Sequence, residues 1–297
     1  MRVAVIGATG VLGRSVVPAL VAAGHDVVGL ARSPEKVEQL LDAGAEAHRC
    51  GLLDHAGLVA MVDGADAVCN LVGRFPTGLA AGRSRGWRLH DRLRTEGVRR
   101  VLDAARDAHV RRFVQDSVSF LYADQGDAWI DEDSPVDITG ATEPASVGEA
   151  YVQDYACGSR TGVVLRFGTV VGGTASARSR VGRSPAQPAG LGSPTGWAHV
   201  VHPDDLGTAV VAALTAPSGV YNVGADPVLR RELDAVPPHG GAVRLAPAGR
   251  RRGGVRLEPF GRSLRVSSRR FAEQTGWTAA RAQFDVSWFD PRTPVRP

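Results

Sequence analysis

The sequence predicts an α/β protein with a doubly wound parallel sheet and a small C-terminal lobe for a substrate. Two observations lead to this prediction. Short apolar segments alternate with helix-like segments through the first two thirds of the 297 residues, which is the rhythm of βαβ units. The first apolar segment also runs directly into glycines at positions 7, 10 and 13. In a parallel sheet, that placement marks a helix start that binds an anion.

The predicted elements of the first part follow in chain order. Gly24 ends the first helix, and Ser33 with Pro34 starts the second as N-cap and first-turn residue. Runs rich in Val, Leu and Ala predict strands at Val3–Gly7, Val27–Ala31, Ala45–Cys50, Ala67–Val72, Arg112–Ser117 and Gly162–Phe167. The segments between them predict helices at Leu12–Ala23, Pro34–Ala43, His55–Val62, Trp87–Ala108 and Glu143–Cys157.

Beyond Phe167 the pattern loosens. Val170–Gly196 is rich in Gly, Ser, Arg and Pro without periodicity, which predicts a long loop. We expect a helix at Pro203–Ala213, capped by Asp204 or Asp205. Short strands are expected on either side of it, at His199–Val201 and Val220–Val223, and the segment Arg230–Gly254 is turn-rich and carries no assignment.

Composition excludes several classes of protein. The chain has no run of about eighteen apolar residues, and its N-terminus enters a strand without a secretory leader. The three cysteines form no CxxC pair, which favours reduced thiols in a cytoplasmic protein. No cluster has metal-ligand spacing, so we expect no metal. From residue 230 onward fourteen basic residues face six acidic ones, but they lack interleaved aromatics, so we expect no nucleic-acid partner.

The glycine-containing stretch VAVIGATGVLGRSVV predicts a dinucleotide site. Small residues allow a tight turn and let backbone N–H groups approach a pyrophosphate. The candidate residues here are Gly7, Thr9, Gly10, Val11, Leu12, Gly13 and Arg14. At the end of the second strand stands Arg32 rather than an acid, because Asp26 precedes that strand. An arginine there suits a 2′-phosphate, so we expect NADP(H) in preference to NAD(H), with NAD(H) still possible.

At these residues the sequence resembles the NAD-dependent epimerase/dehydratase group of extended and atypical short-chain dehydrogenase/reductases. GATGVLG has their GxxGxxG spacing, CGLLDHAGL resembles the segment that borders adenine and includes Leu53, and AVCNLVG resembles a strand end beside the cofactor. The last of these places Asn70, Leu71, Val72 and Gly73 at the cofactor. RRFVQDSVSFLYAD, GVVLRFGTVVGG and GVYNVG resemble later segments, so the likeness covers nearly the whole chain. It implies a Rossmann domain at 1–168 and a segment at 169–297 that completes the sheet and forms the substrate lobe.

The resemblance also implies a catalytic motif that this chain lacks. The family uses Tyr-x-x-x-Lys on the helix after the fifth strand, where the lysine lowers the tyrosine pKa for proton exchange. Lys36 is the single lysine here and lies just past the second strand. Aligned on the family, Ala141 and Ala145 stand where tyrosine and lysine are expected. Val118 stands where Ser or Thr usually polarises the substrate oxygen.

The remaining candidates near the expected nicotinamide end are hydroxyl or carboxyl groups. We predict Ser117, Tyr122 and Glu149 as catalytic residues, against the alternative that each is structural. Tyr151, Trp197 and His202 are candidate substrate contacts. Trp87 and Trp129 join Trp197 as possible walls for a flat substrate.

Three functions remain open from the sequence. The first is an NADP(H)-dependent oxidoreductase or epimerase-like tailoring enzyme, as in bacterial secondary metabolism and antibiotic biosynthesis, that acts on a small and possibly polycyclic organic substrate. The second is a non-redox cyclase, isomerase or dehydratase that retains the cofactor structurally. The third is a non-catalytic NADP sensor resembling NmrA-like regulators. A monomer or a homodimer is expected in each case.

Overall fold

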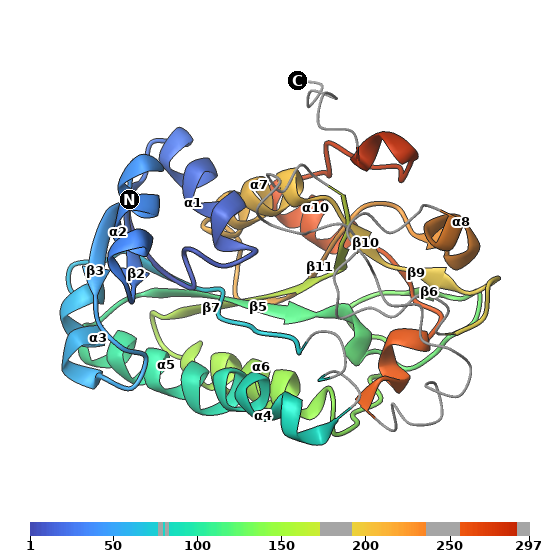
Figure 1. The fold of residues 1–297 in the computed structure, drawn as a ribbon, viewed down its shortest axis with the longest axis horizontal. Coiled ribbons are helices and arrows are strands. Elements are labelled where there is room, and N and C mark those ends of the chain that lie inside the picture. The colour runs from blue at the N-terminus through green and yellow to red at the C-terminus, as the bar shows by residue number, and fades with distance from the viewer. Residues whose placement is uncertain (77–79, 81–82, 173–191, 236–255, 290–297) are drawn as a thin grey trace.

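The computed structural model describes residues 1–76, 80, 83–172, 192–235 and 256–289. Most of the predicted loop Val170–Gly196 and of the unassigned segment Arg230–Gly254 lies outside these residues. A seven-stranded sheet crosses the molecule in the order β11-β7-β5-β4-β1-β2-β3 (Figure 1). Its strands are β1 (Arg2–Ile6), β2 (Asp26–Ala31), β3 (Glu46–Arg49), β4 (Ala67–Asn70), β5 (Arg112–Val118), β7 (Thr161–Phe167) and β11 (Gly219–Val223).

All neighbouring strands of this sheet are parallel. The strand order reverses between β1 and β4, which is the switch point where ligands bind in doubly wound sheets. The predicted fold class is therefore confirmed. The sheet strands and most of the helices begin and end within about two residues of the predicted bounds, as expected where apolar periodicity is strong.

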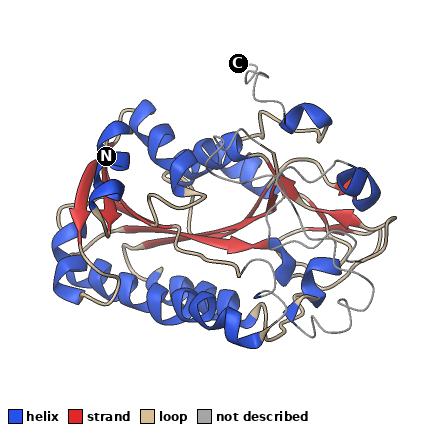
Figure 2. Ribbon diagram, in the orientation of Figure 1, coloured by secondary structure: helices blue, strands red, loops and turns tan. Residues whose placement is uncertain are grey.

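Helices cover both faces of the sheet (Figures 1 and 2). On one face lie α1 (Gly13–Ala22), α2 (Pro34–Asp42), α7 (Pro203–Ala213) and α10 (Arg269–Thr275); on the other lie α3 (His55–Val62), α4 (Ser84–Arg92), α5 (Val98–Asp107) and α6 (Glu143–Tyr155). Each face has its own core. Val16 and Leu20 belong to the first core, and Leu58 and Val101 belong to the second.

The predicted helix Trp87–Ala108 is interrupted by one irregular turn. It consists of α4, a five-residue π-helical turn at Leu93–Gly97, and α5. π turns are rare and often mark functional sites. The side chain of Arg94 on this turn is only 4% exposed.

Three small two-stranded sheets surround the far end of the main sheet. They pair β8 (Thr169–Val170) with β10 (Val200–Val201), β9 (Trp197–Ala198) with β12 (Val228–Leu229), and β6 (Trp129–Ile130) with β13 (Arg265–Val266). α8 (Arg230–Ala235) and a small core around Trp288 complete this part. Because β11 closes the edge of the main sheet, residues beyond 168 contribute to it. The domain boundary itself stays a prediction.

One predicted helix cap was wrong. The N-cap of α7 is His202, whose Nδ1 accepts the N–H of Asp204. Asp205 instead accepts the N–H of Ala280 at 2.8 Å and that of Arg281 at 3.3 Å, which fixes the start of α7 to a distant segment. Among the described residues, no helix has the length and apolarity needed to cross a membrane.

Candidate functional site

The glycine loop joins β1 to α1 at the switch point. Gly7 has a φ of 84°, and a Cβ on it would lie 2.7 Å from the carbonyl oxygen of Leu71. A Cβ on Gly13 would lie 2.3 Å from the carbonyl oxygen of Ala8. The fold itself therefore requires glycine at both positions. Gly10 differs, because a Cβ there would have only the carbonyl oxygen of Gly7, at 3.1 Å, within 4 Å among the described residues other than its chain neighbours. Its outer side is open to a ligand.

The other predicted cofactor residues of this loop, and Leu53 after β3, are partly or largely exposed to solvent. Val11 and Leu53 are each 58% exposed. Exposed large apolar side chains often mark ligand contacts. Thr9 and Leu12 are half-buried beside them, and Arg14 is exposed. The N-terminal turn of α1 and the side chains of Val11 and Leu53 are thus accessible to a ligand.

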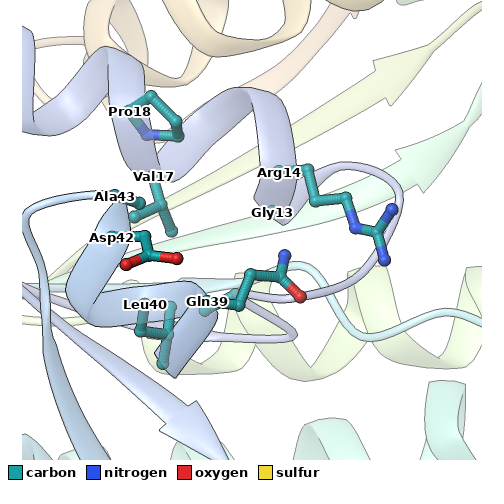
Figure 3. A pocket seen from close by; sticks show the side chains of 9 residues that line it. Gly13, Arg14, Val17, Pro18, Gln39, Leu40, Asp42 and Ala43 are labelled. Atoms are coloured by element: carbon teal, nitrogen blue, oxygen red, sulfur yellow. The ribbon is translucent and has the colours of Figure 1, made fainter. Parts of the chain in front are cut away.

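Three cationic side chains converge beside the loop. Burial lowers the pKa of Lys36, and the nearby charges of Arg14 and Arg32 lower it further. Figure 3 shows Arg14 with Gln39 and other side chains of α1 and α2 around a pocket of about 260 Å³. This pocket lies between the two helices and only borders the expected nucleotide path, which it shares at Gly13 and Arg14. Sequence reasoning missed Lys36, although its place two residues into α2 was visible.

The end of β4 runs beside the glycine loop, and the contact of Asn70, Leu71, Val72 and Gly73 with a cofactor stays a prediction. Leu71 touches Gly7 through its main chain, and the side chain of Asn70 is buried and donates to Gln115 at 2.8 Å. Val72 is half-buried, whereas Gly73 is exposed. A Cβ on Gly73 would lie 3.1 Å from Nη2 of Arg94. Gly73 therefore rests directly on a buried guanidinium.

That guanidinium belongs to a fully buried ion pair. Arg94 donates to the carboxylate of Asp116 at 2.8 Å and to its main-chain oxygen at 2.9 Å. Burial raises the pKa of Asp116, and Arg94 opposes the rise. The ion pair of Arg94 and Asp116 packs against the chain just after β4, at Gly73. No sequence signal singled out Arg94, because a single arginine on a charged helix is ordinary.

The three predicted catalytic residues meet in one buried network. Ser117 donates to Glu149 at 2.5 Å, and both oxygens of Glu149 accept hydrogen bonds from Arg166, at 3.0 and 2.7 Å. Ser117 and Arg166 are direct neighbours on β5 and β7. Sequence reasoning missed Arg166, although an arginine inside the buried strand VVLRF signals an internal acidic partner.

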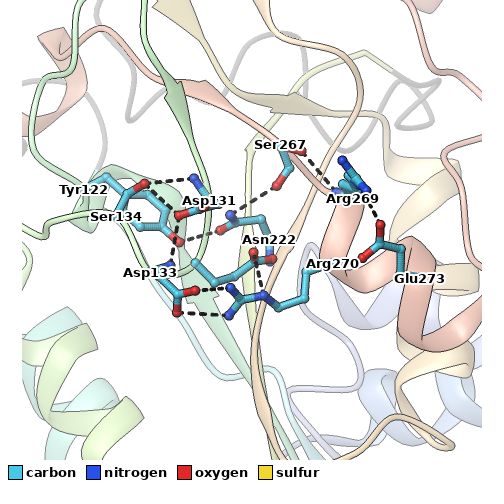
Figure 4. Close-up of polar contacts among 10 residues, drawn as sticks. Tyr122, Asp131, Asp133, Ser134, Asn222, Ser267, Arg269, Arg270 and Glu273 are labelled. Carbon is cyan, nitrogen blue, oxygen red and sulfur yellow. Dashed lines mark hydrogen bonds and ion pairs between the residues drawn. The ribbon is translucent and has the colours of Figure 1, made fainter.

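Tyr122 completes this network without reaching the surface. Its ring lies 4.8 Å from the Arg166 guanidinium, and its hydroxyl donates to Asn222 at 2.8 Å. Burial raises its pKa to about 12, opposite to the lowering that an activated tyrosine needs. Figure 4 shows Tyr122 and Asn222 beside Arg270 and Asp133, which form an ion pair. The catalytic roles of Ser117, Tyr122 and Glu149 stay predictions, and the geometry favours a structural use of all three.

Apolar side chains stand at the positions where the resemblance placed the family's polar groups. We call Val118 and Ala145, which pack together there, with the buried Ala141, the apolar wall. Ala141 and Ala145 are 1% and 4% exposed, and Val118 is 8% exposed. Val118 and Ala145 pack in one cluster against the half-buried rings of Phe75 and Phe120. Among the described residues of this wall there is no hydroxyl or amine for proton transfer.

The candidate substrate contacts lie apart from this wall. Tyr151 packs against the core between the sheet and α5. Trp197 donates to Asp127 at 2.9 Å and, like Trp129, stacks on Arg265. His202 is buried at the start of α7. Trp87 alone of the tryptophans named lies near the wall, beside Phe75. Tyr151, Trp197 and His202 stay predictions as substrate contacts.

Comparison with known proteins agrees with this fold and loop. The chain belongs to the NAD dependent epimerase/dehydratase family, whose model matches residues 3–224. A Streptomyces protein named 3-diazoavenalumate denitrifying reductase is 33% identical over 272 residues, which cover 83% of this chain and 86% of that protein. The chain is therefore an NAD(P)-dependent enzyme of the short-chain dehydrogenase/reductase type.

Solved structures show the same fold at lower identity. MoeE5 in complex with UDP-glucose and NAD superposes with a TM-score of 0.71 at 21% identity, covering 96% of this chain and 95% of that one. UDP-glucose 4-epimerase from Stenotrophomonas maltophila, with bound NAD, gives 0.72 at 18% identity over 97% and 95%. These structures thus share the fold of this chain.

Proposed function

We propose that this protein is an NADP(H)-dependent reductase whose substrate accepts a hydride without needing a proton from the enzyme. The proposal depends on buried apolar side chains at Val118, Ala141 and Ala145, of which Val118 and Ala145 pack in one cluster. Reduction of a carbonyl creates an alkoxide that must be protonated, and the family's tyrosine serves that step. A chain that places buried alanine and valine there suits an electrophile whose reduction generates no anion.

An arenediazonium group has this property. Hydride leaves the nicotinamide with its electron pair and forms a C–H bond at the ring carbon. The C–N bond breaks, and its electron pair departs with N₂. NADPH is oxidised to NADP⁺, the ring carbon is reduced, and no proton is consumed. The Streptomyces relative, named a denitrifying reductase of a diazo compound, supports this substrate class.

In this proposal the protein's own residues bind the cofactor and the substrate and orient them toward each other. NADPH, when bound, supplies the hydride. The glycine loop and α1 hold the pyrophosphate through backbone N–H groups, and the apolar wall keeps water from the reacting carbon. Fixing donor and acceptor in contact supplies much of the rate enhancement. Arg94 and Asp116 hold the end of β4 in place beneath Gly73.

Deuterium tracing tests the reaction. With NADPH deuterated at the transferred position and an arenediazonium salt as substrate, we expect the deuterium at the ring carbon that lost nitrogen, with one N₂ per NADPH consumed. Benzaldehyde should be reduced at least about a hundredfold more slowly. A reaction mixture without protein corrects for direct reduction. Turnover that leaves the cofactor unchanged, or hydrogen drawn from solvent, contradicts the proposal and favours non-redox chemistry.

The preference for NADP(H) rests on the cluster of Arg14, Arg32 and Lys36. Arg32→Ala should weaken NADPH binding about 10- to 100-fold, the range for hydrogen bonds to a charged group, and change NADH binding by less than twofold. Calorimetric titration with both cofactors measures this. Arg99→Ala on the exposed surface of α5 removes the same charge elsewhere and serves as control. Equal losses for the two cofactors would remove the 2′-phosphate assignment.

A further inference from the structure

A group of aromatic side chains adjoins the apolar wall. Phe75 follows β4, Trp87 and His90 lie on α4, Phe120 follows β5, and Phe260 lies on the short turn Glu258–Gly261. We call these five residues the His90 cluster. The Phe75 ring lies 4.5 Å from His90 and 5.8 Å from Phe120, and Phe120 lies 4.6 Å from Phe260. Four segments of the chain thus meet in one aromatic group.

The cluster is continuous with the wall at the reacting centre. Phe75 and Phe120 pack against both Val118 and Ala145 on one side and Trp87 and Phe260 on the other. These two rings are only partly buried, whereas Trp87 and Phe260 are 1% and 7% exposed. Phe75 and Phe120 therefore present free ring surface beyond the ends of β4 and β5, the edge where a doubly wound sheet binds its ligands.

His90 introduces one polar atom into this apolar group. It is 2% exposed, and the main chain of Arg74 lies near its ring and favours a proton on it. Burial lowers its pKa to about 3, so the ring is neutral at physiological pH. We assign the single proton of the neutral ring to Nε2, on the side of Arg74, which leaves Nδ1 as an acceptor. In the part of the chain that the structure describes, Nδ1 has no hydrogen-bond partner.

A buried acceptor without a partner is costly, and native structures rarely leave one unsatisfied. We infer that the His90 cluster binds the aromatic ring of the substrate, and that an O–H or N–H donor on that ring bonds Nδ1 of His90. His90 is then a specificity-determining residue for phenolic or amino-substituted rings. This inference rests on the proposed function, since it names the substrate class of the same site.

Binding measurements with the oxidised cofactor test the inference separately from the reaction. NADP⁺ has no hydride to give, so binding of a ring is measured whether or not the protein is a reductase. The two probes are p-cresol and 4-methylanisole, which differ in the donor hydrogen. NMR titration of the NADP⁺-loaded protein should give about tenfold tighter binding of p-cresol, the value of one neutral hydrogen bond.

A variant then isolates His90. His90→Phe keeps an aromatic ring and removes the acceptor, so the two probes should bind equally, with 4-methylanisole within twofold of its wild-type affinity. His48→Phe, on β3 at the opposite edge of the sheet, is the matched control and should keep the tenfold preference. A preference that survives in His90→Phe, or is missing from the wild type, overturns the inference.

A spectroscopic measurement needs no variant. In wild-type protein with ¹⁵N-labelled histidine, p-cresol should shift the Nδ1 resonance of His90 upfield, as acceptance of a hydrogen bond requires, whereas 4-methylanisole should not. An unmoved Nδ1 resonance at saturating p-cresol would show that another group, such as a buried water, satisfies this nitrogen, and would refute the assignment. Absence of reductase activity with intact p-cresol binding would instead count against the proposed function alone.

Discussion

Gly10→Val is expected to abolish NADPH binding, with a loss of at least about a hundredfold, while the protein stays folded. The reason is the different surroundings of the three loop glycines. A side chain at Gly7 or Gly13 would collide with the protein's own backbone, whereas a Cβ at Gly10 meets only Gly7, at 3.1 Å. Valine at Gly10 therefore projects into the space that a pyrophosphate needs. Calorimetric titration with NADPH and thermal melting measure the two effects.

Gly219→Val is the control for this substitution. Gly219 begins β11 at the far edge of the sheet, and a Cβ there makes only ordinary contact with the Tyr221 ring, at 3.4 Å. Its NADPH affinity should equal that of the wild type. NADPH affinity within twofold of wild type in Gly10→Val would contradict the placement of the dinucleotide on this loop. If both variants fail to fold, the loss of NADPH binding in Gly10→Val would come from unfolding caused by valine and not from a blocked nucleotide site.

The second large effect is on stability. Arg166→Met should lower the free energy of unfolding by about 3–5 kcal/mol, because it leaves the carboxylate of Glu149 buried without its partner. Both side chains are under 10% exposed, so solvent cannot replace the lost hydrogen bonds. Denaturant unfolding followed by circular dichroism gives the value.

The double variant Glu149→Leu with Arg166→Met separates the ion pair from simple loss of packing. Removing both charges should recover most of the lost stability, since apolar replacement of a buried pair is often neutral. With the single variant Glu149→Leu measured as well, the change in the double variant minus the sum of the two single changes gives the coupling energy of the pair. If the loss of unfolding free energy in the double variant equals the sum of the losses in the two single variants, the two residues do not act as a pair. Reductase activity retained in a folded double variant would show that Glu149 is structural.

Much of the fold was predictable because its physical signals are local. The segment from Val3 to Gly13 combines a buried strand, a tight turn and a helix start, and each is read from the residues themselves. The π turn at Leu93–Gly97 was not predictable, because one turn of five residues is too short to alter the apolar pattern of the long predicted helix around it. The N-cap of α7 was missed because His202 took the place of the more usual Asp204.

The sequence predicted the absence of the family's catalytic motif from the candidate site, but it did not predict the side chains that pack there. A chain with one lysine, at position 36, has no Tyr-x-x-x-Lys motif, and the packing of Ala145 against Val118 follows from that loss. The His90 cluster was not predictable, because its members are separated by up to 185 positions and come together only through tertiary packing. A histidine on a helix looks the same in sequence whether its Nδ1 is satisfied or not.

The position of Lys36 has a practical consequence for labelling chemistry. Reagents that acylate amines have one lysine side chain to react with. Burial and the charges of Arg14 and Arg32 lower its pKa, which leaves more of its amine unprotonated and nucleophilic. If NADPH binds beside this cluster as proposed, it should slow acylation of Lys36, and mass spectrometry of the labelled protein would then measure nucleotide occupancy.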